Sequence, residues 1–312
     1  MKKITAIVLA LFGSSLWAAP LAYVPNEGSG TISVIDTVTD TVIGDIPVNG
    51  KPRGIATSPD GKTIYVAEQK SESLLIIDAA TKKITGKVNV GDSPEAAYVS
   101  KDGSLISVAN EEANTVSIID AKTKKLSTVK LKGKNPEHAV FSPDGKLIFA
   151  SAEDADKVDV IDVKSKKQIS QITVGLRPRG ISFTSDGKKA FVASELVDTL
   201  FVIDVATLKV IGQLKTGLRA NGVTVHPNNQ TVYVTNGGDS NVAIIDISSL
   251  TIKKLISVGK RPWNMALTPD GKKLYVANGK SDAVSVINTE SNEVIKHIPV
   301  GKLPWGVSIQ SQ

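Results

Sequence analysis

The chain has 312 residues and no cysteine. This absence excludes disulfides, thiolate metal ligands and the covalent attachment of a c-type haem. Histidine occurs only three times, and no zinc-hydrolase motif, nucleophile elbow or phosphate-binding loop is present. Aromatic residues make up only 4% of the chain. A nucleic-acid-binding surface combines a basic stripe with interleaved aromatics, so nucleic acid is not an expected partner.

Long apolar runs are also scarce, and the one that occurs lies at the N-terminus. Two lysines precede an apolar stretch over residues 4–17, and Ala18 and a second alanine follow it. The stretch is too short to span a bilayer comfortably, and its order of charge, apolar run and small residues is typical of a secretory signal peptide. We therefore expect residues 1–18 to be a signal peptide, the mature chain to be periplasmic, and no membrane span to remain after cleavage.

Positive charge is in mild excess. The formal net charge is +6 at pH 7, and the lysines are spread along the chain, often in turns. Lysines in such positions protect sheet edges and keep a protein soluble. With 41% hydrophobic and 22% charged residues, the composition is that of a globular protein.

An internal repeat of 42 residues runs through the whole mature chain. An Asp or Asn that follows an apolar run marks each repeat: Asp36, Asp78, Asp120, Asp162, Asp204, Asp246 and Asn288. A second marker keeps the same step: Pro52, Pro94, Pro136, Pro178, Ala220, Pro262 and Pro304. A period near 40–45 residues is typical of the blades of a β-propeller. Because the aspartate recurs in six of seven repeats, we interpret it as a turn cap and not as a catalytic acid.

Each repeat is predicted to form four strands. In the repeat after Pro52 they cover residues 54–58, 63–67, 73–77 and 83–90. The Pro-Asp-Gly-Lys sequence at 59–62 predicts a tight turn between the first two strands. The middle strands are rich in Val and Ile on both faces, as expected for sheets that lie between neighbouring sheets.

The two ends of the chain predict how the ring closes. Residues 22–25 match the second strand of a repeat, whereas residues 306–309 match a first strand. Together they complete one blade from both ends. We therefore predict an all-β, seven-bladed β-propeller as a single domain over residues 19–312, and we expect it to be a monomer.

The residue after the second marker varies from blade to blade and is predicted to face the central channel. Around the ring it is Arg53, Glu95, Glu137, Arg179, Asn221, Trp263 and Trp305. Arginines also stand two residues earlier in three blades, at Arg177, Arg219 and Arg261. The loop between the second and third strands reaches the same rim and contributes further acids, among them Glu111, Glu153 and Glu195.

These positions predict a channel mouth with an acidic arc, a basic arc and an aromatic wall formed by Trp263 and Trp305. Arginine binds carboxylates and phosphates through two hydrogen bonds, and tryptophan stacks on planar rings. We therefore expect a planar anionic ligand or an inserted loop of a partner protein. The alternative is that the charges neutralise one another and the tryptophans fill the channel. The candidate ligand- or partner-binding residues are Arg53, Glu95, Glu137, His138, Arg177, Arg179, Arg219, Asn221, Arg261, Trp263 and Trp305.

Other chemistry in the sequence is sparse. His138 follows Glu137 at the predicted rim, and the two side chains could form an acid–base pair. With Glu95 or Glu111, His138 could instead contribute to a metal site, but three histidines without cysteine favour no soft metal. We assign no catalytic residue, no metal site and no cofactor from the sequence.

Several of these segments resemble known families. Residues 23–26, 233–236 and 275–278 each read Tyr-Val-x-Asn and resemble the motif of the YVTN β-propellers, over residues 22–310. The blade-by-blade order, with Arg-Pro-Arg-Gly at 177–180 and Arg-Pro-Trp at 261–263, resembles the PQQ-dependent catabolism-associated β-propeller proteins. The blade at Ala220 departs from this order because it lacks the proline.

The second resemblance implies an exported protein linked to periplasmic quinoprotein alcohol oxidation, with Arg53, Glu95, Glu137, Arg179, Trp263 and Trp305 as its characteristic ring. We therefore expect a binding or accessory protein, not an enzyme, whose rim holds a small planar anion or a periplasmic redox enzyme. The alternatives are a lactonase- or lyase-like enzyme and a metal-handling protein that uses Glu137 and His138.

Overall fold

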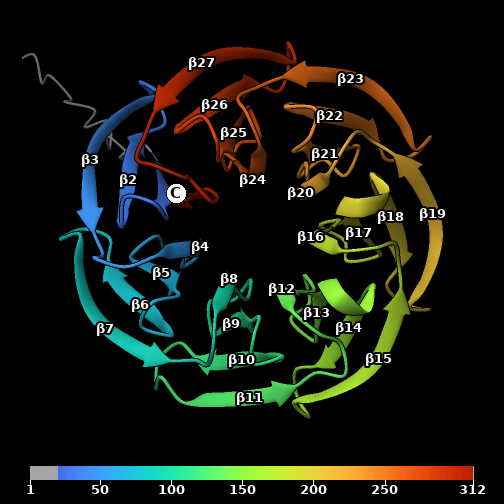
Figure 1. Ribbon diagram of the computed structural model, residues 1–312, viewed down its shortest axis with the longest axis horizontal. Coiled ribbons are helices and arrows are strands. Elements are labelled where there is room, and N and C mark those ends of the chain that lie inside the picture. Colours follow the sequence, from blue (N-terminus) through green and yellow to red (C-terminus); the bar gives the residue numbers. More distant parts are fainter. Residues whose placement is uncertain (1–19, 312) are drawn as a thin grey trace, which may run out of the picture.

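The structure is a computed structural model that describes residues 20–311, so the predicted signal peptide at 1–18 lies outside the described residues. Within this range, seven four-stranded antiparallel sheets are arranged in a ring around a central channel (Figure 1). The predicted seven-bladed β-propeller is therefore confirmed. The described residues contain no helix that is long and apolar enough to cross a membrane.

Each blade runs from an inner strand at the channel to an outer strand at the circumference (Figure 1). The first three blades are β28 (Ser308–Ile309), β1 (Leu21–Asn26), β2 (Thr31–Asp36) and β3 (Thr41–Pro47); β4 (Pro52–Thr57), β5 (Thr63–Glu68), β6 (Ser73–Asp78) and β7 (Lys83–Asn89); and β8 (Pro94–Val99), β9 (Leu105–Asn110), β10 (Thr115–Asp120) and β11 (Leu126–Lys130). The next two are β12 (Pro136–Phe141), β13 (Leu147–Ala152), β14 (Lys157–Asp162) and β15 (Lys167–Thr173); and β16 (Pro178–Phe183), β17 (Lys189–Ser194), β18 (Thr199–Asp204) and β19 (Lys209–Lys215). The last two are β20 (Ala220–Val225), β21 (Thr231–Asn236), β22 (Asn241–Asp246) and β23 (Thr251–Ser257); and β24 (Pro262–Leu267), β25 (Lys273–Asn278), β26 (Ala283–Asn288) and β27 (Glu293–Pro299). Short 3-10 helices η1 (Glu153–Ala155) and η2 (Glu195–Val197) follow β13 and β17.

The two ends of the chain share one blade, as predicted. Strand β28 pairs antiparallel with β1, and the Trp305 amide donates a hydrogen bond to the Pro25 carbonyl at 3.0 Å. The regular part of β28 is shorter than the predicted strand over 306–309. The other six inner strands have a register shift at the equivalent place, after the marker residue, which interrupts regular pairing there.

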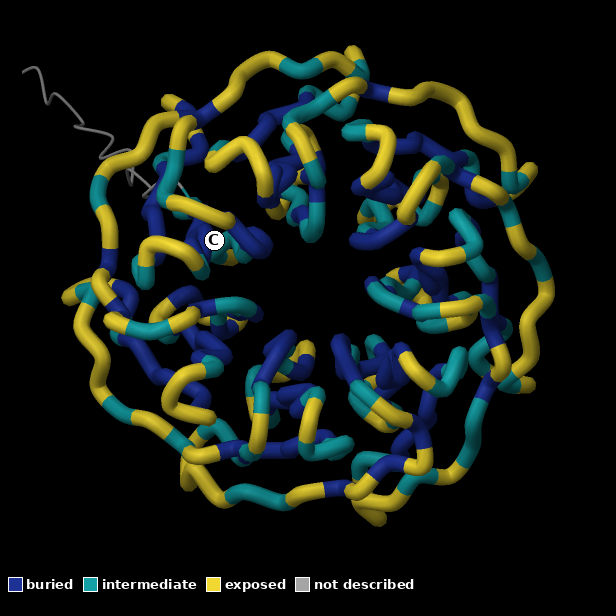
Figure 2. The backbone as a smooth tube through the Cα atoms, in the orientation of Figure 1, coloured by how far each residue is buried: buried dark blue, intermediate teal, exposed yellow. Residues whose placement is uncertain are grey.

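The hydrophobic core lies between the blades. Seven clusters of buried side chains occur among the described residues, and each joins two neighbouring blades. Figure 2 shows the consequence, since the middle strands are buried and the outer strands are largely exposed. Valine and isoleucine on both faces of the middle strands suit this environment because both faces are covered.

The marker aspartates are turn caps, as predicted. The Asp78 carboxylate accepts hydrogen bonds from the backbone amide and the hydroxyl of Thr81, both at 2.7 Å. In the seventh repeat the Asn288 side-chain oxygen accepts the amides of Glu290 and Ser291 at 2.9 Å. A neutral residue therefore caps the same turn, which agrees with a structural role for the acid.

The inner strands approach one another closely, and this approach positions the channel residues. A Cβ atom added to Gly180 in β16 would lie 2.6 Å from the Asn221 carbonyl oxygen in β20. Only glycine permits such an approach of two backbones. A register shift between Pro178 and Ile181 accompanies it, and bulges of this kind redirect side chains. Arg179 lies within this bulge and lines the channel mouth.

Candidate functional site

One mouth of the channel holds a polar cavity of about 260 Å³. Its walls come from the inner strands and the rim loops of several blades: Glu27, Arg53, Glu111, Glu137, Arg177, Arg179, Asn221, Arg261, Trp263, Asn264 and Trp305. Most of the residues that the sequence singled out therefore meet in one place. Three of them, Glu95, His138 and Arg219, do not line the cavity.

Four arginines of the mouth converge on one carboxylate, Glu195 in η2, which is fully buried. The ion-pair distances to its oxygens are 2.7 Å from Arg261 Nη2, 3.0 Å from Arg179 Nε, 3.2 Å from Arg219 Nη1 and 3.5 Å from Arg177 Nε. Burial alone would raise the pKa of Glu195, but the positive charges of Arg179 and Arg261 bring it below its ordinary value. Glu195 was not among the predicted site residues, although its loop position matched that of Glu153.

The mouth is therefore not divided into an acidic and a basic arc, and this part of the sequence prediction is wrong. Arg179 contacts Glu137 and Glu153 as well as Glu195, so it lies between carboxylates of three elements. Arg177 bridges Glu153 and Glu195 in the same way. Charges of opposite sign interleave because buried charges are stable only when they are paired.

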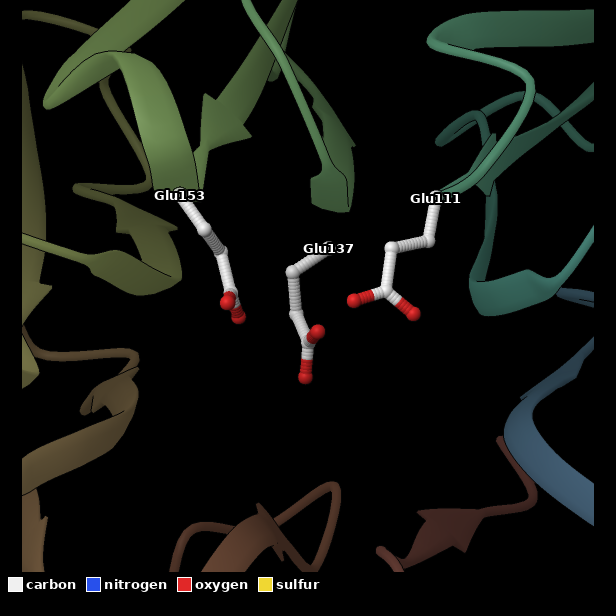
Figure 3. A group of neighbouring side chains, drawn as sticks. All are labelled: Glu111, Glu137 and Glu153. Atoms are coloured by element: carbon white, nitrogen blue, oxygen red, sulfur yellow. The ribbon is translucent and has the colours of Figure 1, made fainter.

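Three carboxylates gather on the other side of Arg179. One oxygen from each of Glu111, Glu137 and Glu153 lies within 4.8 Å of the other two, and Figure 3 shows the three side chains converging on the mouth. Burial and the neighbouring Glu137 charge raise the pKa of Glu153 to about 8. Burial also acts to raise the pKa of Glu137, but the Arg179 guanidinium brings that pKa below its ordinary value.

Glu95 and Arg53 form a second paired group beside this cluster. The Arg53 guanidinium contacts one oxygen of Glu95 and lies 3.3 Å from a Glu27 oxygen. The Gln69 amide donates to the same Glu95 oxygen at 2.5 Å. Glu95 is completely buried, and burial together with the Glu137 charge raises its pKa well above the ordinary value.

His138 does not lie at the rim, so the predicted pairing of its side chain with Glu137 is wrong. The imidazole is buried, its Nδ1 lies 2.5 Å from the Tyr98 hydroxyl, and it stacks on the Trp305 indole with ring centroids 5.9 Å apart. Burial lowers the pKa of His138 to about 4, so the ring is neutral at pH 7. Successive residues of a strand point in different directions, and no hydrogen bond or ion pair joins this ring to the Glu137 carboxylate among the described residues.

The two tryptophans both line the mouth cavity but in different ways. Trp263 is partly exposed there, whereas Trp305 is 8% exposed. Trp305 also lines a second cavity of about 270 Å³, whose walls include Tyr98, Phe141 and Ile181. Trp305 therefore borders both cavities.

The comparisons with known proteins give the family. A family model for lactonase, 7-bladed beta-propeller, matches residues 85–294, and a model for YNCE-like beta-propellers matches residues 16–104. The chain therefore belongs to the lactonase-type seven-bladed β-propeller family.

Solved structures agree with the fold. The hydrazine synthase of Kuenenia stuttgartiensis is 24% identical with a TM-score of 0.76, covering 82% of this chain and 89% of that chain. A Bacteroides fragilis protein described as a candidate 6-phosphogluconolactonase is 20% identical with a TM-score of 0.77, covering 95% of this chain and 99% of that chain.

A sequence match covers only a short segment. A PE-PGRS family protein of Mycobacterium tuberculosis is 57% identical over 37 residues, and this match spans 12% of the present chain and 8% of that protein.

The family corrects one expectation from the sequence. We expected a protein that is not an enzyme, because the sequence contains no familiar catalytic motif. Membership of a lactonase family points instead to enzyme activity. Hydrolysis of a lactone needs a general base and a hydrogen-bond donor or cation that stabilises the oxyanion. Neither group requires a fixed sequence motif.

Proposed function

We propose that this protein is a lactone hydrolase that acts on a small anionic lactone at the mouth of its channel. The lactonase family model carries this proposal, because the matched residues 85–294 include Glu137, Glu153 and the four arginines around Glu195. The polar cavity is the place where these side chains meet.

The size and lining of the cavity support a small substrate. Its volume of about 260 Å³ lies below the roughly 300–1,000 Å³ of pockets for drug-sized ligands, so it suits a single ring. Trp263 offers a flat face to such a ring. Arg177, whose side chain is 39% exposed, and Arg261 lie in the same wall and suit a carboxylate or phosphate of the substrate. The planar, anionic ligand that the sequence predicts is thus proposed as the substrate.

The reaction needs a water molecule and a proton acceptor. The oxygen of the water bonds to the lactone carbonyl carbon, the ring carbon–oxygen bond breaks, and the proton lost by the water reaches the departing alkoxide. The product is an open-chain hydroxycarboxylate. We assign Glu137 as the acceptor of the proton, because the Arg179 guanidinium 2.5 Å away favours its ionised form. Arginines beside it would stabilise the negative charge on the carbonyl oxygen.

Turnover of small lactones, measured by acid release, tests this function. We expect Glu137→Gln to lower kcat/KM about 100-fold or more, because general base catalysis contributes roughly that factor. Arg177→Ala should raise KM for lactones that carry a carboxylate or phosphate but not for neutral ones. Glu112→Gln is the matched control, since this exposed acid lies outside the cavity. Turnover that survives Glu137→Gln, or no turnover of any lactone, would contradict the proposal.

The remaining predictions from the sequence stay proposals. Export to the periplasm rests on residues 1–18, and N-terminal sequencing of the mature protein tests it by whether the chain begins after Ala18. The likeness to the PQQ-dependent catabolism-associated proteins, the periplasmic redox partner and the monomeric state likewise remain predictions.

A further inference from the structure

The carboxylates of Glu111, Glu137 and Glu153 come from three different elements and still meet. Glu137 lies in the inner strand β12, Glu153 opens η1, and Glu111 lies in the loop after β9. One oxygen of each lies within 4.8 Å of the other two, and all three carboxylates point toward the same space in Figure 3. An arrangement of this kind brings like charges together, so positive charges must offset their repulsion.

The arginines of the mouth do not neutralise this carboxylate cluster fully. Arg179 contacts Glu137 and Glu153, but Glu111 forms no ion pair among the described residues and accepts one long hydrogen bond, 3.4 Å, from the Ser93 hydroxyl. Six carboxyl groups and five guanidinium groups gather around the mouth: Glu27, Glu95, Glu111, Glu137, Glu153 and Glu195 with Arg53, Arg177, Arg179, Arg219 and Arg261. Glu111 is the acid of this group that forms no ion pair among the described residues.

A second observation points to a missing positive charge at the same place. Glu95 is completely buried, and its Oε2 atom has no hydrogen-bond partner among the described residues. Hydrogen bonds connect its other oxygen through Gln69 and Ser93 to Glu111, so the Glu95 carboxyl borders the cluster. The Glu137 and Glu111 charges both act to raise the pKa of Glu95. A buried carboxylate oxygen without a partner is costly unless a cation or a proton is nearby.

We propose that Glu111, Glu137 and Glu153 bind a hard divalent cation, with Ca²⁺ as the expected ion. The donors are all carboxylate oxygens, which Ca²⁺ prefers, and the nearest histidine is turned away into its contact with Tyr98. Ca²⁺ binds oxygen at about 2.3–2.6 Å, so two oxygens on opposite sides of the ion stand about 4.6–5.2 Å apart. Three oxygens that lie within 4.8 Å of one another are close enough for one ion to contact all of them.

The surroundings of the cluster allow a cation to enter and stay. Glu111 and Glu137 line the polar cavity, which gives an entry path and room for coordinating water. Arg179 contacts Glu137 and Glu153, and Glu195 at 3.0 Å keeps its guanidinium paired when the cation takes those two carboxylates.

Terbium luminescence tests the site and its position. Tb³⁺ replaces Ca²⁺ in oxygen sites and emits when a nearby indole transfers energy to it. Trp263 and Trp305 line the cavity beside Glu111 and Glu137, so indole excitation of the mature protein should give terbium emission. Excess Ca²⁺ should suppress the emission. We expect Glu111→Gln to weaken Tb³⁺ and Ca²⁺ binding at least 10-fold, and calorimetric titration with CaCl₂ gives the same comparison without terbium.

Glu112→Gln is the matched control, since it removes the same charge from the adjacent exposed position. Equal binding by the wild type, Glu111→Gln and Glu112→Gln would overturn the proposal, as would the absence of binding at millimolar Ca²⁺. The measurement uses no substrate, and Glu111 has no assigned part in lactone hydrolysis. Failure of the cation site and failure of the proposed function can therefore be told apart.

Discussion

Among single residues, Glu195 has the largest share of the electrostatic pairing in the mouth. Its carboxylate is fully buried and pairs with four arginines. Arg177 and Arg179 belong to the same blade as Glu195, and Arg219 and Arg261 come from the next two blades. A charge in this position is tolerated only because of its partners, and the partners depend on it in turn. Removal of this one side chain would leave Arg179 and Arg261, which are only 11% and 16% exposed, without their common anion.

We therefore expect Glu195→Ala to lower the free energy of unfolding by about 3–5 kcal/mol, the usual cost of breaking a buried ion pair on one side. Urea unfolding followed by circular dichroism measures this change. Glu112→Gln, an exposed position, should stay within about 0.5 kcal/mol of the wild type. Equal stability of Glu195→Ala and the wild type would mean that solvent already satisfies these arginines.

Among the elements, the inner strands decide where the mouth residues point. Six of the seven begin at a marker residue and shift register within the next three residues. Some of them also approach the neighbouring inner strand closely. Gly180 permits this approach between β16 and β20, and it directly follows Arg179. Packing of the inner backbones and placement of the functional side chains are therefore linked.

Gly180→Ala should destabilise the protein by about 1–3 kcal/mol, because a methyl group would lie 2.6 Å from the Asn221 carbonyl oxygen and force the strands apart. The matched control is Gly86→Ala in the outer strand β7, where the nearest heavy atom lies at 3.8 Å. This change should be neutral or slightly stabilising, since alanine restricts the unfolded chain. Thermal unfolding of both variants measures the difference, and similar midpoints would show that the inner strands can separate at little cost.

At the scale of the whole molecule, stability depends on closure of the ring. Strand β28 supplies the inner strand of the first blade, and its neighbours also bond to the next blade, where Gln310 contacts the Gly61 carbonyl. Trp305 comes from the same short segment and stacks on His138. The chain has no disulfides, so noncovalent contacts of this kind join its two ends.

Deletion of residues 303–312 should lower the urea midpoint strongly, because β1 loses one of its two partner strands and the protein loses a buried indole. Loss of the indole alone costs about 3–5 kcal/mol at a buried site. Deletion of the last two residues, which follow the paired strand, should leave the midpoint unchanged. A protein shortened from 303 that unfolds like the wild type would show that the ring does not need this closure.

The sequence by itself determined the architecture and the ring of variable residues. Strand and turn chemistry is local, so a 42-residue period with a capped turn in each repeat predicts blades, their number and their shared closure. The same period identifies the residue after each marker proline as a channel residue. Eight of the eleven predicted site residues accordingly line one cavity. The sequence predicted a lactonase-like enzyme only as an alternative, because no local motif marks a base and its charge partners in this fold.

Only the tertiary structure decided which side chains meet. Glu195 binds arginines up to 66 positions away in the chain, and Glu111 meets Glu153 across a gap of 42 positions. His138 is one residue from Glu137, yet it contacts Tyr98 and Trp305 from other blades and not its neighbour's carboxylate. Such pairings depend on the direction of each side chain after the bulge and on the burial of its charge. Side-chain direction and burial are fixed only when the ring has closed and the inner strands have packed.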